Sequence, residues 1–245
     1  MDSDDTPVGR VLPRREAIAV LGLTGIAFLA GRMRPDRVSA QSRRRVPACV
    51  ARPEQTAGPY FVDTRLHRSD IRSDPETGAL KEGAPLALVL AVSRLHQGSC
   101  APLTGAHVDI WHCDALGVYS DVRDPGFDTV GQRFLRGYQL TDDAGEVRFR
   151  TIYPGWYEGR AVHIHFKVRT DPGRSSGLEF TSQLYFDDTL TGRIHERAPY
   201  AAKRGRRDRN ADDRIFGRGG DQLLLSTTPA GDGYAARFDL GLQSP

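Results

Sequence analysis

Short apolar segments bounded by turn residues recur along the chain after residue 84. Each is about as long as one strand, and none extends into the longer 3.6-residue periodicity of an amphipathic helix. The segments span 85–92, 106–111, 134–140, 146–152, 162–168, 180–186, 222–227 and 234–240. This spacing predicts an all-β chain folded as an antiparallel β-sandwich. The stretches 41–84 and 187–221 lack such segments, and we expect them to be loop-borne additions to the sandwich.

One turn between these segments has a specific sequence. The four residues 142–145, Asp-Asp-Ala-Gly, connect 134–140 to 146–152. Aspartate side chains can bond the backbone of a turn, and Gly145 can take a positive φ without steric cost. We therefore expect a β-hairpin at this point.

The N-terminus has a different pattern from the rest of the chain. An uncharged apolar run of 14 residues, 17–30, follows the pair Arg14–Arg15. The run is shorter than the roughly 20 residues that a membrane-spanning helix needs, and small residues follow it. Paired arginines before such a run are typical of a twin-arginine export signal. We expect 1–40 to be this signal, cleaved near Ala40, and 41–245 to be one exported domain (secreted, periplasmic or cell-surface) without a stable membrane anchor.

The charge of the chain gives no indication of a nucleic-acid partner. The net charge is +3 over 245 residues, which is close to neutral. One basic cluster, 203–218, has seven basic and three acidic residues and little apolar content. Charge runs of this kind are usually solvated, so we interpret this cluster as a surface loop.

Three cysteines in an exported protein permit one disulfide and leave one thiol. Cys113 lies within a strand pattern, where a free cysteine behaves as a small buried hydrophobe. Cys49 and Cys100 lie in predicted loops at the edges of strands, so we expect these two to form the disulfide.

Two histidines stand at positions i and i+2 of the segment 162–168. Successive side chains of a strand point to opposite faces, so His163 and His165 project the same way and can converge on one metal ion. The apolar residues Ile164 and Phe166 alternate with them, which predicts a half-buried strand. The spacing alone also fits two hydrogen-bonded or solvated histidines.

Two tyrosines make a metal site a stronger hypothesis. Tyr119 follows a predicted turn at Gly117, and Tyr157 precedes the histidine pair. Phenolate is a hard anionic ligand that favours a highly charged ion, whereas neutral imidazole suits iron, copper and zinc. The alternative is that both tyrosines are rim or core aromatics with a hydrated hydroxyl.

Together these residues resemble a known family. Four motifs occur in the order found in intradiol ring-cleavage dioxygenases, the non-haem ferric enzymes that include the protocatechuate and catechol dioxygenases. The resemblance covers about 48–190 and is closest to secreted, single-domain members. The motifs are Asp109-Ile-Trp-His with Gly117-Val-Tyr119, Pro154-Gly-Trp-Tyr157, Arg160-Ala-Val-His-Ile-His-Phe166 and Thr181-Ser-Gln-Leu-Tyr-Phe186.

The resemblance implies a function and a set of roles. The chain would use one Fe(III) to cleave the ring of a catechol-type substrate with O2, giving a muconate-type diacid. The implied metal ligands are Tyr119, Tyr157, His163 and His165. Tyr157 would also act as a base in catalysis, and Arg160 would stabilise developing negative charge and contact the substrate. Gln183 and Tyr60 would contribute to substrate binding.

Two other classes of protein stay open at this point. The first is an exported β-sandwich binding module whose tyrosines stack on an aromatic or sugar ligand, without catalysis. The second is a zinc or copper hydrolase or oxidase that uses the same histidines. The sequence also leaves open a homo-oligomer and the identity of the catechol. Only Glu158 and Gly159 separate Tyr157 from Arg160, where catechol and protocatechuate enzymes have a longer insertion, so we expect a more open site. His107 and His112 are interpreted as structural, and Tyr185 as a core residue.

Overall fold

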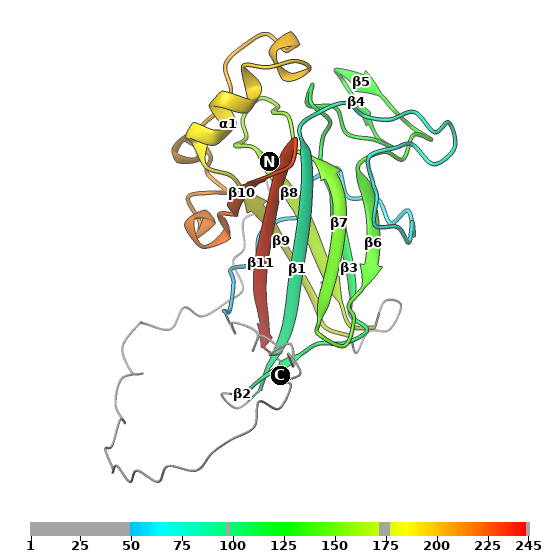
Figure 1. Ribbon diagram of the computed structural model, residues 1–245, viewed down its shortest axis with the longest axis vertical. Coiled ribbons are helices and arrows are strands. Elements are labelled where there is room, and N and C mark those ends of the chain that lie inside the picture. Colours follow the sequence, from blue (N-terminus) through cyan, green and yellow to red (C-terminus); the bar gives the residue numbers. More distant parts are fainter. Residues whose placement is uncertain (1–49, 97–98, 172–176, 244–245) are drawn as a thin grey trace, which may run out of the picture.

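The computed structural model describes residues 50–96, 99–171 and 177–243 (Figure 1). The predicted export signal at 1–40 and Cys49 lie outside the described residues, so cleavage, export and the Cys49–Cys100 disulfide stay predictions. Cys113 is free and buried, as expected. No helix in the described part of the chain is long and apolar enough to cross a membrane.

Two main sheets form the molecule. The larger sheet has the order β10-β11-β1-β2, and β7 pairs with β1 off this path. Its strands are β1 (Pro85–His96), β2 (Ser99–Pro102), β7 (Glu146–Ile152), β10 (Ser226–Ala230) and β11 (Gly233–Gln243). The second sheet has the order β6-β3-β8-β9. Its strands are β3 (His107–Trp111), β6 (Arg136–Leu140), β8 (His163–Arg169) and β9 (Glu179–Tyr185), and a separate two-stranded ribbon is formed by β4 (Arg123–Asp124) and β5 (Phe127–Asp128).

The sheets lie face to face, with β1, β7 and β11 in front of β3, β8 and β9 in the view of Figure 1. One hydrophobic core, to which both sheets contribute, fills the space between them: Leu86, Leu88 and Leu90 of β1 are buried with Phe166 of β8. The predicted all-β antiparallel sandwich is confirmed. Within it, the long strands β1 and β11 run parallel to each other.

The strand in this region begins later than the predicted segment 222–227. Residues Gly220–Leu223 form the short 3-10 helix η3, and strand β10 begins at Ser226. Leu223 and Leu225 are buried, and the Leu225 N–H donates to the Tyr185 carbonyl at 2.8 Å. The two leucines therefore fill the core from an irregular segment, which an apolar pattern alone cannot distinguish from a strand.

The stretch 187–221 predicted as loop contains short helices. Helix α1 (Asp188–His195) begins where the Asp187 side chain accepts a hydrogen bond from the Leu190 N–H, an N-cap. Two 3-10 turns, η1 (Tyr200–Ala202) and η2 (Asn210–Asp212), follow it before η3. The prediction missed α1 because a helix of this length gives almost no periodicity.

The turn at 142–145 has the predicted conformation but not the predicted connectivity. Gly145 has φ 73°, and its N–H donates to the Asp142 carbonyl at 2.8 Å. The strands on either side, β6 and β7, belong to different sheets, so the hairpin prediction is wrong. The Gly145 carbonyl accepts from the Val92 N–H at 2.8 Å, which draws the chain onto β1 instead of back along β6.

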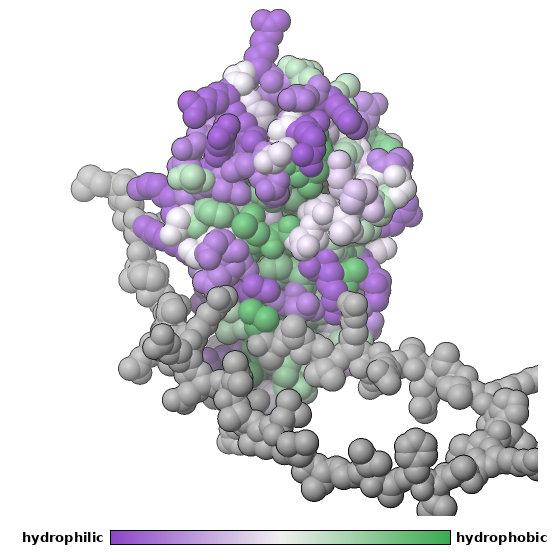
Figure 2. Space-filling view, turned by 60° about the vertical axis from the view of Figure 1, so that its left-hand side comes forward, coloured by the Kyte–Doolittle hydropathy of each residue, from purple (hydrophilic) through white to green (hydrophobic). Residues whose placement is uncertain are grey.

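Strand β8 is buried on both faces, not half-buried as predicted. His163 and His165 are as inaccessible as Ile164 and Phe166. The half-buried prediction fails because loops cover the face that carries the histidines. On the face shown in Figure 2, polar residues cover much of the coloured surface, and apolar areas lie between them.

Candidate active site

Four side chains meet beside β8. His163 and His165 project from this strand, Tyr119 comes from the loop after β3, and Tyr157 from the loop before β8. The Nε2 atoms of the two histidines are 3.0 Å apart. The Oη atoms of Tyr157 and Tyr119 lie 3.2 and 3.5 Å from Nε2 of His163. The structure therefore brings together all four residues that the sequence analysis singled out as metal ligands.

The environment of the two imidazoles favours their neutral form. Burial is the main cause that lowers the pKa of both His163 and His165 well below the usual value, and the positive charge of Arg160 adds to it. Nδ1 of His163 donates to the Ala161 carbonyl at 2.7 Å, which leaves the lone pair of Nε2 pointing toward His165. In the metal-free protein one proton can bridge the two Nε2 atoms, and a cation in its place would bind both lone pairs.

The two phenols would need a cation beside them in order to ionise. Burial raises the pKa of Tyr119 well above its usual value and that of Tyr157 to about 12, and the Arg160 charge only partly opposes the effect on Tyr157. A buried phenolate thus requires a compensating positive charge.

The donor atoms fit a single metal ion. Two ligand atoms at right angles around a metal, each bonded at about 2.1 Å, lie about 3 Å apart, which is close to the 3.0 to 3.5 Å found here. No group of three or more His, Cys, Asp or Glu side chains within the described ranges could hold a metal, so the phenols are needed to complete the set. Two imidazoles and two phenols suit a hard, highly charged ion.

Arg160 and Gln183 adjoin the four side chains. Nη1 of Arg160 lies 3.5 Å from the Tyr157 hydroxyl, and its Nη2 donates to Oε1 of Gln183. The Gln183 amide donates in turn to the Thr56 carbonyl at 2.9 Å, so the irregular segment before β1 holds this side chain from the other side. The predicted pair is therefore at the site, and its contact with substrate stays a prediction.

Tyr60 covers one of the tyrosines. Its ring stacks on Tyr119 with the centroids 4.3 Å apart, and its hydroxyl donates to Asp124 at 2.8 Å. The buried guanidinium of Arg136 donates to the Tyr60 carbonyl at 3.2 Å and to Oγ of Ser120 at 2.8 Å. These contacts hold the segment of Tyr60 against the loop of Tyr119. Substrate binding by Tyr60 stays a prediction.

Three residues at the site were not predicted there. Tyr185, interpreted as core, donates through its hydroxyl to Gln55 at 2.9 Å and to Gln183 at 3.1 Å. Trp111 stacks almost parallel on His165 with the centroids 4.9 Å apart. Asp213 accepts a hydrogen bond from Nε of Arg160 at 3.0 Å. The i, i+2 spacing of Gln183 and Tyr185 was the signal available for the first of these.

Two glycines hold the tyrosine loops together. Gly117 has φ 84°, and a Cβ there would lie 2.2 Å from the Trp156 carbonyl oxygen. A Cβ on Gly155 would lie 2.4 Å from the Ala115 carbonyl oxygen. The backbone of the Tyr119 loop thus touches that of the Tyr157 loop, which fixes the spacing of the two hydroxyls.

The two histidines interpreted as structural lie away from the four donors. His112 is buried, with Nδ1 2.8 Å from the Cys113 carbonyl and Nε2 2.6 Å from the Thr151 hydroxyl. His107 is also buried and packs edge-on against Tyr138. Both positions agree with the structural interpretation.

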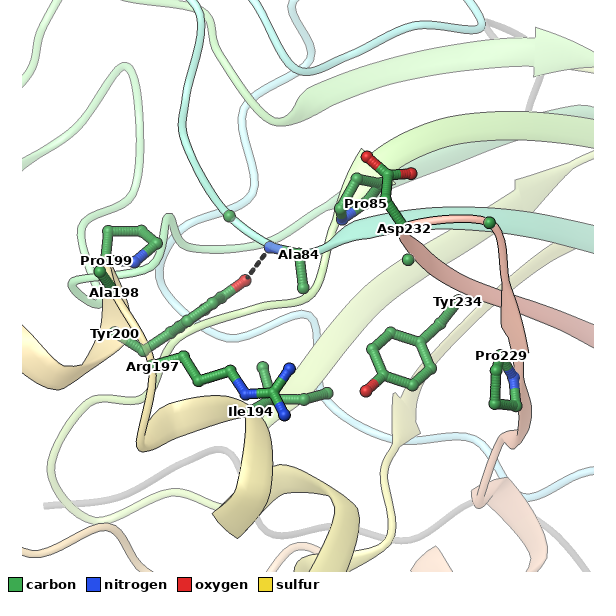
Figure 3. A pocket seen from close by; sticks show the side chains of 13 residues that line it. Ala84, Pro85, Ile194, Arg197, Ala198, Pro199, Tyr200, Pro229, Asp232 and Tyr234 are labelled. Atoms are coloured by element: carbon green, nitrogen blue, oxygen red, sulfur yellow. Dashed lines mark hydrogen bonds between the residues drawn. The ribbon is translucent and has the colours of Figure 1, made fainter.

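Two surface hollows differ in their relation to this site. One, of about 510 Å³, adjoins Trp156 and Glu158, the neighbours of Tyr157. The other, of about 500 Å³, is separate from the four donors and is shown in Figure 3. Its wall includes Tyr200, whose hydroxyl accepts a hydrogen bond from the Ala84 N–H at 3.0 Å.

Comparison with known proteins identifies the family. The family model described as "Dioxygenase" matches residues 56–194. The chain is 33% identical over 149 residues to the chlorocatechol 1,2-dioxygenase of Pseudomonas putida, which covers 53% of this chain and 52% of that protein. It is 29% identical over 182 residues to the protocatechuate 3,4-dioxygenase beta chain of Burkholderia cepacia, covering 69% and 71%. The match thus spans about half the length of the chlorocatechol enzyme.

A solved structure agrees with these matches. The intradiol ring-cleavage dioxygenase from Tetranychus urticae superposes with a TM-score of 0.66 at 30% identity, covering 80% of this chain and 94% of that one. The chain belongs to the intradiol ring-cleavage dioxygenase family.

Proposed function

We propose that this chain is a non-haem Fe(III) dioxygenase that opens the ring of a catechol-type substrate with O2 and yields a muconate-type diacid. The observation that carries the proposal is the meeting of two imidazole and two phenol donors at distances suited to one metal ion. Tyr119, Tyr157, His163 and His165 would hold one Fe(III) per chain. When bound, the ferric ion supplies the Lewis acidity that binds both catechol oxygens and makes the ring reactive toward O2.

Tyr157 is the proposed base for the substrate. Its Oη lies 3.5 Å from Nη1 of Arg160, whose positive charge favours the phenolate form. As a phenolate, this oxygen can accept a proton from a catechol hydroxyl that approaches the site.

Arg160 is the proposed electrostatic partner of the substrate. Its guanidinium is permanently charged and is held at the edge of the site by Gln183. A fixed cation beside a ring that gains negative charge stabilises that charge without reorganisation. Gln183 would act chiefly through this contact.

A catechol is the substrate class that the relatives favour, because those reported above are named for chlorocatechol and protocatechuate. Only two residues separate Tyr157 from Arg160, and a hollow of about 510 Å³ adjoins the first of these, Glu158. We therefore propose a site that accepts substituted catechols.

Colour and oxygen uptake test the function. The protein reconstituted with ferric iron should show a visible tyrosinate-to-iron charge-transfer band and consume O2 when catechol is added. Tyr119→Phe should lose the band and turnover, whereas the control Tyr138→Phe, at a half-buried tyrosine outside the site, should keep both. A protein that stays colourless with iron would favour the binding module. Bound zinc or copper, with no ring-opened diacid formed from catechol, would favour the zinc or copper hydrolase or oxidase.

Export by the twin-arginine route is a separate proposal, supported by the residues at 14–40. Replacing Arg14 and Arg15 together by lysine should keep the precursor inside the cell. Unchanged export of this variant would remove the proposal.

A further inference from the structure

Asp213 lies in the part of the chain that follows the family match. The match ends at residue 194, and Asp213 stands in the basic cluster 203–218 that the sequence suggested was solvated. Its side chain is nevertheless only 1% exposed. A carboxylate buried to this degree needs hydrogen bonds or a counter-ion to offset its desolvation.

Both oxygens of this carboxylate are occupied. Oδ1 accepts hydrogen bonds from the Ile215 and Phe216 N–H groups at 2.7 and 3.3 Å. Oδ2 accepts from the Ala161 N–H at 2.9 Å and from Nε of Arg160 at 3.0 Å. Three backbone donors therefore fix the carboxylate, and the fixed carboxylate then holds the arginine.

The position of Nε determines where the rest of the guanidinium points, because the group is planar and its donors form a rigid fork. Nη2 is taken by Oε1 of Gln183 and lies 3.4 Å from the Tyr185 hydroxyl. The remaining terminal nitrogen, Nη1, is the one 3.5 Å from the Tyr157 hydroxyl. Asp213 and Gln183 thus bind Nε and Nη2 of the guanidinium, and this leaves Nη1 directed toward the Tyr157 hydroxyl.

Asp213 also balances charge next to the four donors. Arg160 is 14% exposed at its side chain, and an arginine so enclosed without a counter-ion would carry an uncompensated positive charge beside a cation site. The Asp213 carboxylate forms an ion pair with Arg160 at 3.0 Å that offsets part of the cost of burying this charge. The ion pair also fixes the direction in which the remaining N–H groups of Arg160 point.

We propose that Asp213 is a positioning residue of this dioxygenase, which orients Arg160 toward Tyr157 and makes the segment 203–218 part of the site. The inference rests on the proposed function and deepens it. Asp213 acts through the arginine and does not itself touch the substrate.

A double-mutant cycle separates this role from the structural role that Asp213 has toward the Ala161, Ile215 and Phe216 N–H groups. The iron-loaded wild type, Asp213→Asn, Arg160→Met and the double variant are compared by kcat/KM for catechol. Hydrogen bonds to charged groups contribute about 1.5–3 kcal/mol, so Asp213→Asn should lower kcat/KM by roughly 10- to 100-fold in the wild-type background. In the Arg160→Met background it should cause no further loss, because the contact is already gone.

The matched control is Asp221→Asn, which removes the same charge from an exposed aspartate outside the segment 203–218. Asp221 does not line the hollow beside Trp156 and Glu158. This variant should retain wild-type kcat/KM. Equal losses for Asp213→Asn in both backgrounds of the cycle would assign Asp213 a structural role only and overturn the proposal.

A second readout needs neither iron nor turnover. In nitrogen-15 spectra of the metal-free wild type, the Arg160 Nε–H should give a separate, slowly exchanging signal, identified by its absence in Arg160→Met. Asp213→Asn should shift or broaden this signal. A wild-type Arg160 signal that coincides with those of mobile surface arginines overturns the proposal, even if Asp213→Asn does not fold.

The two hypotheses fail in different ways. A wild type that consumes no O2 with catechol contradicts the proposed function. A wild type that is active, with Asp213→Asn equally active, contradicts the positioning role alone.

Discussion

The two faces of β8 are buried to the same degree and differ in chemistry. Ile164, Phe166 and Val168 are 0% exposed and point into the core, whereas His163 and His165 are 2% and 1% exposed and point toward the two tyrosines. Apolar side chains gain free energy from burial, but buried imidazoles need partners. A polar face with as little exposure as the core is therefore a better indicator of a site than a surface hollow, since the hollow lined by Tyr200 is separate from the four donors.

Removal of an imidazole from the polar face should have the largest effect. His163→Ala deletes the nitrogen that lies within 3.5 Å of the other three donor atoms. We expect bound iron to fall below stoichiometry and O2 uptake with catechol to fall to the background rate, as measured by metal analysis and an oxygen electrode. His67→Ala, at an exposed histidine, is the control. Full iron content in His163→Ala would contradict the assignment of this ligand.

Truncation on the apolar face should instead affect stability. The Phe166 ring packs with its centroid about 6 Å from those of Phe180 and Phe238. Phe166→Ala should lower the free energy of unfolding by about 3–5 kcal/mol in urea titrations, because a cavity replaces the ring. The protein that remains folded should bind iron normally. A loss below about 1 kcal/mol would mean that the core can collapse around the cavity.

Acid should weaken the metal-free protein through its buried histidines. Burial lowers the pKa of His112 to about 4 and those of His163 and His165 well below the usual value of about 6.5. Below pH 6.5 the unfolded chain binds protons that the folded chain excludes, so stability falls with pH by up to about 1.4 kcal/mol per pH unit for each histidine. Asp109 opposes this trend, because burial raises its pKa to about 6.

Urea unfolding of the metal-free protein at pH 7 and pH 5 measures this loss. His112→Asn should reduce the slope of the unfolding free energy against pH by up to about one proton, because it removes one buried titrating group. This histidine lies outside the site, so the metal ligands are left intact. Equal stability at the two pH values would show that the buried histidines are not kept neutral.

Tyr185 of β9 contacts both the hydrophobic core and the site, and its substitution should give the smallest effect. Its ring packs edge-on against Phe216 at 5.0 Å, while its hydroxyl donates to Gln55 and Gln183. Tyr185→Phe keeps the ring and should cost about 0.5–1.5 kcal/mol in thermal unfolding, with the iron band retained. A complete loss of the iron charge-transfer band would instead indicate that Tyr185 is itself a metal ligand.

Most of the sandwich could be predicted from the sequence, because each strand is a short apolar segment that can be recognised without knowledge of its partners. The segment 85–92 is apolar throughout, and in β1 it buries Leu86, Leu88 and Leu90. The order in which the chain passes from one sheet to the other depends on contacts between residues far apart in the sequence. Nothing in the turn at 142–145 indicates that the N–H of Val92, 53 residues before Gly145, donates to the Gly145 carbonyl, or that β7 joins the other sheet.

The candidate site was predictable to the extent that its residues stand close together in the sequence. His163 and His165 share one strand, and Tyr157 and Arg160 lie just before it. Asp213 was not predictable in the same way, because its partner is 53 residues earlier in the chain and its charged neighbours suggested a solvated loop. A single long-range contact between an acid and an arginine produces no periodic pattern in the sequence.

The backbone contact at Gly117 and Gly155 limits how such a protein could be remodelled by laboratory evolution. A side chain at either glycine would collide with a carbonyl group of the opposite loop. Selection for bulkier substrates is therefore expected to leave both glycines untouched and to collect substitutions elsewhere around the entrance.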